Sequence, residues 1–191
     1  MTAAQLSLFE RAPALPPGLR YQPSLVGEDE ERALLAAFER FDFAPFEFRG
    51  FIGQRRTVSF GWRYDFDRGG LQRAAPIPPE LLGLRGRVSG FADLSASALV
   101  HVLVTEYTPG AAIGWHRDRP EFGDVVGVSL ASSCTFRLRR KADLGWERVS
   151  LPLPPRSAYL LAGPSGSEWE HSIPGVDALR YSVTFRTLRE P

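Results

Sequence analysis

The segment LRYSVTFRTL, residues 179–188, alternates polar and apolar side chains with the period of two that is typical of a β-strand. Tyr181, Val183 and Phe185 would share one face of this strand, and we expect them to pack into a core. The opposite face would carry four polar side chains: Arg180, Ser182, Thr184 and Arg186. Two arginines on one face of a buried strand need anions opposite them, because an unpaired buried charge is costly. A pair of surface salt bridges is the alternative for either arginine alone.

Five further short segments with strand character lie between residues 98 and 163, and an earlier one, TVSFGWRYDF, covers residues 57–66. Helical spacing of apolar residues predicts one helix from Gly27 to Phe41 and a second from Pro79 to Phe91. The spacing of the strands predicts a sandwich or barrel over the C-terminal two thirds, with the helices on one side. The expected fold class is therefore mainly β with flanking helices (α+β).

The length of 191 residues suits one domain with a tail. We expect a flexible arm over residues 1–20, where prolines break any period, and a single domain over residues 21–191. No apolar run approaches the roughly 20 residues that cross a bilayer. The N-terminus has no secretory pattern and Cys134 is the only cysteine, which indicates a reducing, cytoplasmic setting.

The net charge of +1 does not by itself demand a polyanionic partner. The cations are nonetheless clustered, with arginines at Arg55-Arg56 and a basic run at residues 137–141 that ends in the only lysine, Lys141. The planar guanidinium suits carboxylate and phosphate recognition. A GC-rich genome would produce the same lysine-poor composition, so the clusters carry modest weight.

The stretch GWHRDRPEF, residues 114–122, contains a candidate metal site. If the stretch is extended, His116 and Asp118 point to the same face and can reach one ion. His171 in the distant segment EWEHSIP can supply a third ligand. Two histidines and one carboxylate around an open face are typical of non-haem Fe(II) oxygenases. The pattern H-x-D alone is common by chance. The predicted strand that carries Arg180 and Arg186 therefore adds essential support for a metal site.

Other polar residues near these motifs have less certain roles. His101 has no carboxylate close to it in the sequence, and we expect it in the core or at a strand edge. Glu121, Asp124 and Trp169 lie near the candidate ligands in the sequence and are candidates for a supporting role around the metal. Spacing alone assigns none of these roles.

The ordered set of H-x-D, a distant His and then R-Y-x-x-T-F-R resembles the AlkB family of Fe(II)- and 2-oxoglutarate-dependent dioxygenases. The resemblance covers roughly residues 18–188 and is sharpest from Thr105 to Arg186. It implies a double-stranded β-helix, or jelly roll, with N-terminal helices on one side, and hence an AlkB-like dioxygenase domain over residues 21–191. It also implies Fe(II), 2-oxoglutarate and O₂ as cofactor and co-substrates.

The resemblance makes His116, Asp118 and His171 the iron ligands and the catalytic centre. Arg180 would bind the remote carboxylate of 2-oxoglutarate as a bidentate pair. Arg186 would lie nearer the metal-chelating end of the same molecule.

The co-substrate pocket would also include Thr105, Tyr107 and Ser182. Thr105 and Ser182 stand where AlkB has asparagines, and both hydroxyls still form hydrogen bonds. Pro120 stands where the bacterial prototype has an acidic residue that helps to read the damaged base. The base preference of that prototype therefore does not transfer to this sequence.

The family pattern also suggests where substrate would bind. FGWRYDF, residues 60–66, matches a strand at the lid of the substrate pocket, which would place Trp62 and Tyr64 on one face where a flipped base stacks. Arg55, Arg56 and Arg63 would then meet phosphates. The alternative is that the two aromatic residues belong to the core, as they do in most strands.

The N-terminal arm contains a short motif of its own, made by Gln5, Leu6, Ser7, Leu8 and Phe9. This motif resembles the bacterial sliding-clamp-binding pentapeptide Q-L-S/D-L-F. A flexible arm with closely spaced apolar anchors can dock into a groove on a partner. The alternative is that these apolar residues fold back onto the domain.

The leading functional hypothesis is a dioxygenase that oxidatively demethylates alkylated nucleobases in DNA, or in RNA, as part of alkylation repair. In the chemistry that the resemblance implies, an N-methyl group is hydroxylated and leaves as formaldehyde, which restores the base. One alternative is an RNA-modifying or protein hydroxylase of the same superfamily. The other is a non-enzymatic binding module that the clamp recruits.

Overall fold

The structure is a computed structural model that describes residues 15–48, 51–65 and 69–189 of the chain. The motif predicted to bind a sliding clamp, residues 5–9, lies outside the described residues. No helix among the described residues is long and apolar enough to cross a lipid bilayer.

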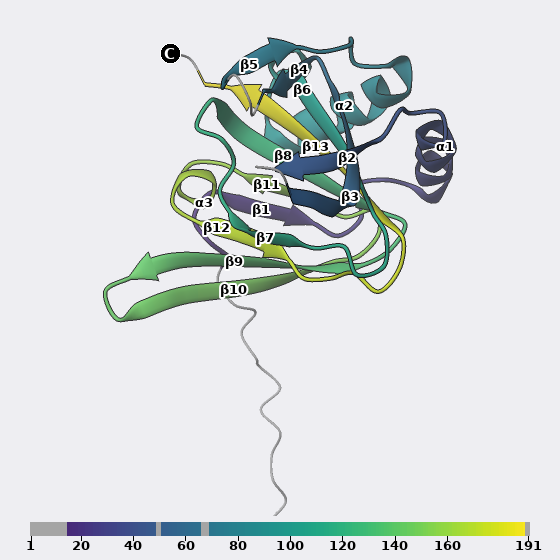
Figure 1. Cartoon of the computed structure of the whole chain (residues 1–191). Helices are drawn as coiled ribbons and strands as arrows, with labels where there is room; N and C mark the ends of the chain where they lie inside the picture. Colours follow the sequence, from purple (N-terminus) through teal and green to yellow (C-terminus); the bar gives the residue numbers. More distant parts are fainter. Residues whose placement is uncertain (1–14, 49–50, 66–68, 190–191) are drawn as a thin grey trace, which may run out of the picture.

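Two antiparallel sheets lie face to face (Figure 1). The larger sheet contains seven strands, in spatial order β1 (Leu19–Gln22), β11 (Ala158–Leu161), β8 (Phe122–Leu130), β13 (Arg180–Leu188), β6 (His101–Tyr107), β3 (Phe51–Phe60) and β2 (Ala44–Phe48). The smaller sheet contains four strands, β10 (Gly145–Leu153), β9 (Cys134–Ala142), β12 (Glu170–Ile173) and β7 (Ile113–His116). This arrangement confirms the predicted mainly β jelly roll with flanking helices.

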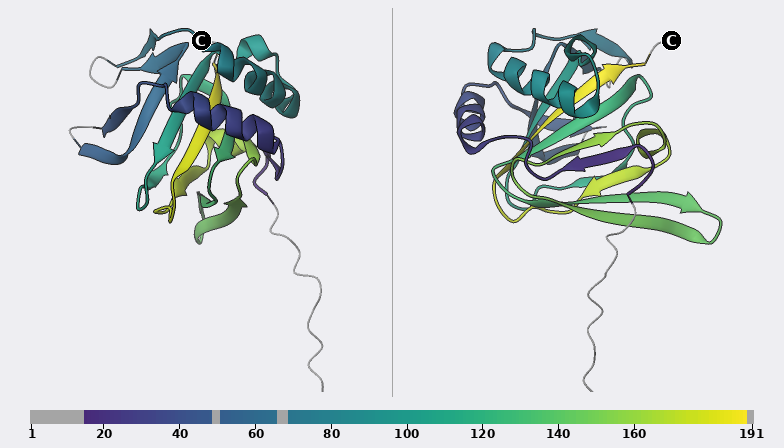
Figure 2. Two further views of the ribbon diagram at one scale, coloured as in Figure 1. Left: turned by 90° about the vertical axis from the view of Figure 1, so that its right-hand side faces the viewer. Right: turned by 180° about the vertical axis from the view of Figure 1, so that it is seen from behind.

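Helices cover the outer face of the larger sheet (Figure 2). The helical elements are α1 (Glu28–Phe38), α2 (Pro79–Ala92), the single 3-10 turn η1 (Ala96–Ala98) and the short α3 (Pro164–Ser167). Leu34 and Phe38 of α1 and Leu81 of α2 are buried in one core together with Val183 and Phe185 of β13. The apolar face of β13 therefore packs under the helices, as its alternation predicts. Its polar face is left pointing into the space between the two sheets.

The expected continuous strand over residues 57–66 is wrong at Gly61. The backbone of Gly61 has a φ of +75°, and a Cβ atom there would lie 2.0 Å from the carbonyl oxygen of Val100. Only glycine fits such a turn. The chain therefore leaves β3 and forms a separate ribbon from β4 (Trp62–Tyr64) and β5 (Leu71–Arg73).

The strands that sequence patterns did not predict are short or lie at edges. β7 and β12 have four residues each, too few to show a period. β1 begins at Leu19, inside the range expected for the arm, and pairs with β11 through the Leu19–Leu161 register. The first helix ends at Phe38 and not at Phe41.

A polar cluster on the helix side of the larger sheet explains the position of Arg56. Its Nε and Nη2 atoms donate to the carboxylate of Glu106 at 2.8 and 2.9 Å, and the Tyr181 hydroxyl donates to the same carboxylate at 2.9 Å. The hydrogen bond from Arg56 lowers the pKa of Glu106, against the opposing effect of burial. Arg56 is therefore a partner of Glu106 on the face opposite to the polar face of β13.

We predict that Glu106→Gln destabilises the fold by about 1–3 kcal/mol at neutral pH, because a buried acceptor of three hydrogen bonds loses its charge. When the pKa of a carboxylate is lower in the folded state than in the unfolded state, its ionised form stabilises the fold at pH values above the unfolded-state pKa. This stabilisation is lost as the pH falls through the pKa of the folded state. The stability gap between wild type and variant should therefore narrow below pH 4.5, the ordinary pKa of the group. Denaturant unfolding across pH tests this, with the exposed Glu168→Gln as a control that should change stability by less than about 0.5 kcal/mol. An unchanged gap at acid pH would contradict it.

Candidate active site

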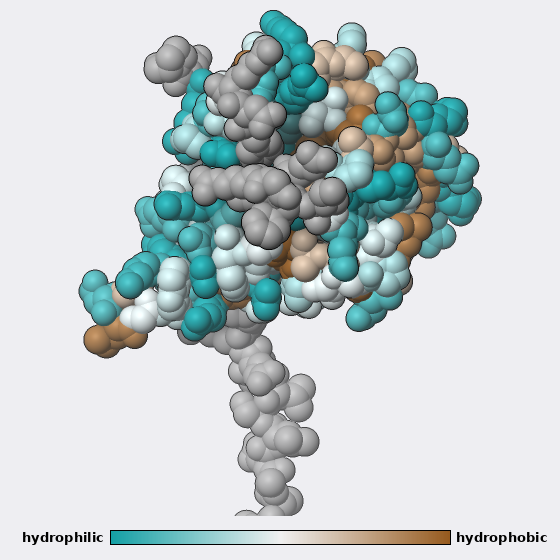
Figure 3. Space-filling model, in the orientation of Figure 1, coloured by the Kyte–Doolittle hydropathy of each residue, from teal (hydrophilic) through white to brown (hydrophobic). Residues whose placement is uncertain are grey.

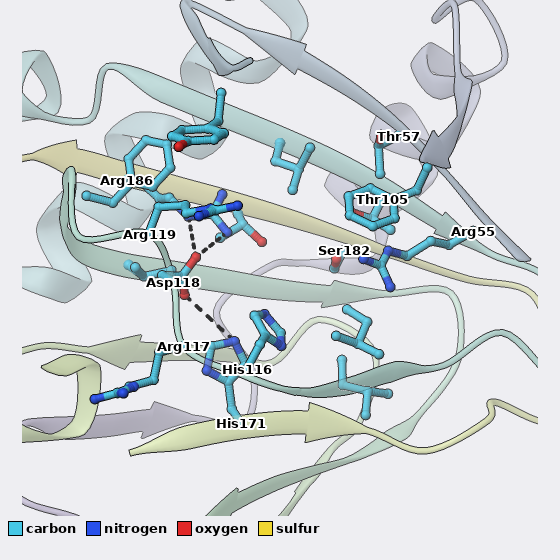
Figure 4. A pocket seen from close by; sticks show the side chains of 18 of the residues that line it. Arg55, Thr57, Thr105, His116, Arg117, Asp118, Arg119, His171, Ser182 and Arg186 are labelled. Carbon is cyan, nitrogen blue, oxygen red and sulfur yellow. Dashed lines mark hydrogen bonds and ion pairs between the residues drawn. The ribbon is translucent and has the colours of Figure 1, made fainter. Parts of the chain in front are cut away.

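A pocket of about 800 Å³ lies between the two sheets. The polar face of β13 forms one wall with Arg180, Ser182, Thr184 and Arg186. The facing wall comes from β7 and β12 of the smaller sheet, with His116 and His171 (Figure 4). The volume lies within the range of about 300–1,000 Å³ that is usual for small-molecule sites.

The pairing of β7 with β12 brings the two candidate histidine ligands together. His116 and His171 are directly opposite each other in the antiparallel register, and opposite residues project to the same face. Their ring centroids are 4.3 Å apart. Asp118 follows the end of β7, and its Oδ2 atom lies 3.7 Å from Nε2 of His171. The three residues thus meet at one end of the pocket, although His116 and His171 are 55 positions apart in the sequence.

Arg186 crosses from the larger sheet to hold Asp118. Its Nε and Nη2 atoms lie 2.8 and 2.7 Å from Oδ1 of the carboxylate, and both side chains are almost buried. Burial by itself would raise the pKa of Asp118, but the charge of Arg186, with smaller contributions from the neighbouring histidines, outweighs burial and lowers the pKa to about 2. Burial lowers the pKa of His171 to about 4. Both groups therefore have the protonation state that metal ligands need at neutral pH.

The donor set fits Fe(II) in chemical type, because imidazole and carboxylate in a two-to-one ratio suit that ion. Among the residues that the structure describes, no group of three histidine, cysteine, aspartate or glutamate side chains is already arranged closely enough to bind a metal ion. The Asp118 carboxylate is instead turned toward Arg186 in Figure 4. His116 and His171 nevertheless lie on paired strands, and Asp118 follows the end of one of them, so these three residues are the candidate ligands for the iron.

Arg180 provides the second half of the site. Its side chain is 1% exposed, its guanidinium lies 4.8 Å from the Tyr107 ring centroid, and its Nε donates to the Ser129 hydroxyl at 3.1 Å. Its Nη1 atom is buried and has no hydrogen-bond partner within the described part of the chain. A buried guanidinium with an unused donor needs an anion, and the terminal carboxylate of 2-oxoglutarate fits that need.

Hydroxyl groups separate the arginine end from the metal end of the pocket. Thr57, Thr105, Ser182 and Ser129 are consecutive register partners on β3, β6, β13 and β8. The Tyr107 hydroxyl lies 3.3 Å from the Ser182 hydroxyl. The predicted co-substrate residues Thr105, Tyr107 and Ser182 are therefore brought together with Arg180. A row of hydroxyls across one sheet is suited to a polar molecule that extends from Arg180 toward the histidines.

The predicted substrate residues are divided by the fold. Arg55, Arg63 and Tyr64 line the pocket, whereas Arg56 lies on the opposite face of β3. Trp62 is absent from the described pocket lining, and the guanidinium of Arg73 lies 4.3 Å from its ring. Trp62 and Tyr64 lie two positions apart on β4 and so share a face of that ribbon, but of the two only Tyr64 lines the pocket.

Two residues that sequence reasoning did not assign to the site belong to it. Ser129 accepts a hydrogen bond from Arg180, and the alternation of β8 places it opposite Ser182. His101 is buried, as predicted, but it also lines the pocket and lies 3.3 Å from Nη1 of Arg186. Burial lowers the pKa of His101 to about 2, so its ring stays neutral beside the arginine. The sequence could have revealed this position, because His101 lies an even number of residues before Thr105 and Tyr107 on the same strand and therefore shares their face.

The three residues suggested for supporting roles differ in position. Glu121 has a buried Oε2 atom without a hydrogen-bond partner in the described residues. The backbone N–H of Asp124 donates to the Thr187 hydroxyl at 2.9 Å. Trp169 is buried in the second core, with the Arg140 guanidinium 5.1 Å from its ring.

Comparison with known families agrees with this geometry. Residues 48–186 match the family model of the 2OG-Fe(II) oxygenase superfamily. The chain belongs to this superfamily. Membership confirms the predicted enzyme class, an AlkB-like 2-oxoglutarate-dependent dioxygenase, and the predicted Fe(II), 2-oxoglutarate and O₂.

Several AlkB-related proteins are similar to the chain. The "Alkylated DNA repair protein ALKBH8 homolog" of Arabidopsis thaliana is 28% identical over 201 residues, which cover 91% of this chain and 56% of that protein. The "tRNA (carboxymethyluridine(34)-5-O)-methyltransferase ALKBH8" of Mus musculus is 24% identical over 176 residues, which cover 84% of this chain and 24% of that protein. The chain thus spans about half the length of these relatives, or less. The solved structure of OsALKBH1 shares the fold, with a TM-score of 0.65 at 17% identity, and the match covers 91% of this chain and 100% of that one.

We predict that Arg180→Met raises the KM for 2-oxoglutarate by at least about 100-fold, because two charge-assisted hydrogen bonds to the carboxylate are lost. Fe(II) affinity should remain unchanged, since Arg180 contacts none of the three candidate ligands. Succinate release at increasing 2-oxoglutarate concentration, together with calorimetric binding, measures the effect. The matched control Arg148→Met removes an exposed arginine and should leave the KM unchanged. A KM equal to that of wild type in Arg180→Met would disprove the assignment.

Proposed function

We propose that this chain oxidatively demethylates alkylated nucleobases, with DNA as the preferred substrate, in alkylation repair. The observation that carries the proposal is the combination, in one pocket, of two histidines and an ionised aspartate with a buried arginine that has an unused donor. The first three groups suit Fe(II), and the arginine suits a dicarboxylate. The space above them can then receive a base.

Bound iron and 2-oxoglutarate supply the oxidation of a C–H bond by O₂. The residues of the chain hold and orient the reactants. Arg180 and the hydroxyl row fix the co-substrate, while Arg186 keeps Asp118 ionised and oriented. When the oxidised carbon is an N-methyl group, the hydroxymethyl product releases formaldehyde and the base is restored.

The rim of the pocket supports a nucleobase as the target. The Arg119 guanidinium lies 4.4 Å from the ring of Tyr64, and both residues line the pocket. Arg63 also lines the pocket, whereas Arg55 lies at its other end, where Tyr107 is its register partner (Figure 4). Aromatic and guanidinium planes are the groups on which unstacked bases pack, and the arginines can also meet phosphates.

RNA modification is the second candidate. It is supported by the similarity to mouse and macaque proteins named as tRNA methyltransferases, although the match covers only about a quarter of each. It is also supported by Pro120 at the pocket, where the bacterial prototype has an acidic residue. Parallel DNA and RNA substrates in one assay separate the two candidates.

We predict that the purified protein with Fe(II), 2-oxoglutarate and ascorbate releases formaldehyde from N-methylated oligonucleotides and restores the base, as read by mass spectrometry.

His116→Ala should reduce turnover at least about 1,000-fold, because it removes a ligand at an open site. Its melting temperature should stay near that of wild type, since half-buried His116 lies at the end of an edge strand. Normal turnover in His116→Ala would refute the site assignment, and no turnover by wild type on methylated DNA or RNA would refute the repair function.

We further propose that residues 5–9, QLSLF, recruit the protein to a bacterial sliding clamp in a cytoplasmic setting. The support is the pentapeptide pattern in an arm with closely spaced apolar anchors, which suits docking into a groove. Such recruitment would raise the local concentration of the enzyme at DNA without changing its pocket.

We predict that Leu8→Ala with Phe9→Ala abolishes binding of the full chain to a purified bacterial sliding clamp, as measured by surface plasmon resonance. Formaldehyde release from a methylated oligonucleotide should not change, because the two residues precede the domain. The matched control Ala3→Ser with Ala4→Ser alters the same arm and should preserve clamp binding. Equal binding by the double alanine variant and wild type would exclude the motif.

A further inference from the structure

The outer face of the smaller sheet, on the side opposite to the pocket, carries a concentration of cations. On β9 the inward side chains are apolar, with Phe136 and Leu138 fully buried. The alternate side chains, Arg137, Arg139 and Lys141, therefore point outward. β10 follows the same rule, with Val149 and Leu151 buried and Trp146 and Arg148 exposed.

Cation–π contacts order part of this face. The Arg139 guanidinium lies 4.4 Å from the ring of Trp115 on β7 and 4.2 Å from the ring of Trp146 on β10. Arg137 lies 5.2 Å from the same Trp115 ring. One arginine is thus held between two tryptophans from strands on opposite edges of the sheet, and the exposed Trp146 is fixed in orientation.

Carboxylates are fewer than cations on this face. Arg139 pairs with Glu170 at 2.7 Å, and Glu170 is the only acidic residue on the outward positions of these four strands, all of which are described. Arg148 is the direct register partner of Arg139, which places two guanidinium-bearing residues opposite each other. Like charges directly opposite each other are destabilising. Lys141 and Arg148 have no ion-pair partner in the described residues.

The inward side of the same hairpin shows the opposite pattern. Arg140 pairs there with Glu147 at 2.9 Å and with Glu168 at 2.8 Å. Carboxylates are therefore supplied on the side that faces the body of the protein, and they are lacking on the outward side. This asymmetry leaves Lys141 and Arg148 as outward cations that can meet an external anion.

The β9–β10 hairpin extends beyond the rest of the molecule in Figure 1 and in the right-hand view of Figure 2. β12 pairs with β9 only as far as Arg139, so the end of the hairpin is a two-stranded ribbon. Its surface is mostly hydrophilic, with a hydrophobic tip (Figure 3). Such a ribbon can reach a molecule that is too large for the pocket.

Trp115 connects this surface to the pocket. It lines the pocket and also contacts Arg137 and Arg139 on the outer face. From β7 to β10 there are three strand spacings, or about 14 Å. That distance corresponds to about four steps of a B-form strand at roughly 3.4 Å each. A strand with one nucleotide in the pocket would reach the cations within a few nucleotides.

We propose that a surface formed by Trp115, Arg137, Arg139, Lys141, Trp146 and Arg148, the hairpin track, binds the sugar–phosphate strand that continues from the nucleotide in the pocket. The inference rests on the proposed nucleic-acid function and adds to it a second binding surface. The phosphates lie against the outward cations, and Trp146 supports a neighbouring base or sugar. The track therefore contributes affinity for long substrates and none for a substrate that ends at the pocket.

The test compares the full-length wild type with Lys141→Gln/Arg148→Gln. Neither residue belongs to the candidate active site. Fluorescence anisotropy measures binding of a labelled DNA strand of about 15 nucleotides, single or in a duplex, from about 50 to about 200 mM salt. The affinity of the variant should fall by about tenfold or more at the lowest salt concentration. The slope of a plot of log K against the logarithm of the salt concentration should become shallower by about 1.5, because two phosphate contacts are lost. Turnover of a methylated trinucleotide should equal that of wild type.

Two further variants sharpen the result. Arg32→Gln/Arg40→Gln removes the same charge from exposed positions on and beside α1, and it should bind as wild type does. Trp146→Ala should weaken binding several-fold without changing the salt slope, because no charge is removed. Equal affinity and salt slope for Lys141→Gln/Arg148→Gln and wild type on every strand would overturn the track. Loss of binding to poly-glutamate alone would assign the surface to an acidic polypeptide and would also overturn it.

The outcomes separate this inference from the proposed function. Binding that depends on the hairpin without turnover of any methylated strand would support the track and reject demethylation. Turnover without dependence of long-strand binding on the hairpin would support demethylation and reject the track.

Discussion

The ion pair between Arg186 and Asp118 connects the two sheets at the place where the chemistry is expected. Arg186 belongs to the central region of the larger sheet, whereas Asp118 follows the edge strand of the smaller one. Both side chains are almost buried, so removal of either would leave an uncompensated charge between the sheets. The pair therefore fixes the separation of the sheets at the metal end and keeps the carboxylate ionised. His101 lies against the same guanidinium and stays neutral chiefly because it is buried.

The remaining layout follows from the period of two along each strand. On β13, odd-numbered side chains pack beneath α1 and α2, and even-numbered side chains face the pocket. β6 and β3 repeat this division, so Tyr107 and Arg55 face the pocket while Glu106 and Arg56 face the helix side. A single-residue shift of register would exchange the two sets and bury the arginines in the apolar core. The apolar packing under the helices and the polar pocket therefore stabilise the same register.

The sequence was sufficient for those features that depend on local periodicity. The polar face of β13, the two helices and the mainly β class all follow from patterns within about ten residues. The adjacency of His116, Asp118 and His171 was inferred through the family resemblance, since strands of four residues show no period that would reveal the pairing of β7 with β12. The separate ribbon that begins at Trp62 was not predictable, because the turn at Gly61 depends on contact with Val100, a residue distant in the sequence. Arg56 was assigned to phosphate because its partner Glu106 lies 50 positions away.

The net charge of this protein does not indicate its local surface potential, because acidic and basic residues are distributed unevenly over its surface. The total of +1 arises from 23 basic and 22 acidic residues, which would suggest a balanced exterior. The structure instead places carboxylates against Arg56, Arg140 and Arg156, where they stabilise contacts between elements. With the acidic groups engaged in these pairs, Lys141 and Arg148 on the β9–β10 hairpin have no ion-pair partner among the described residues. Because a phosphate strand responds to local potential within about 10 Å at physiological salt, and not to total charge, a nearly neutral protein of this kind can still present a cationic surface to nucleic acid.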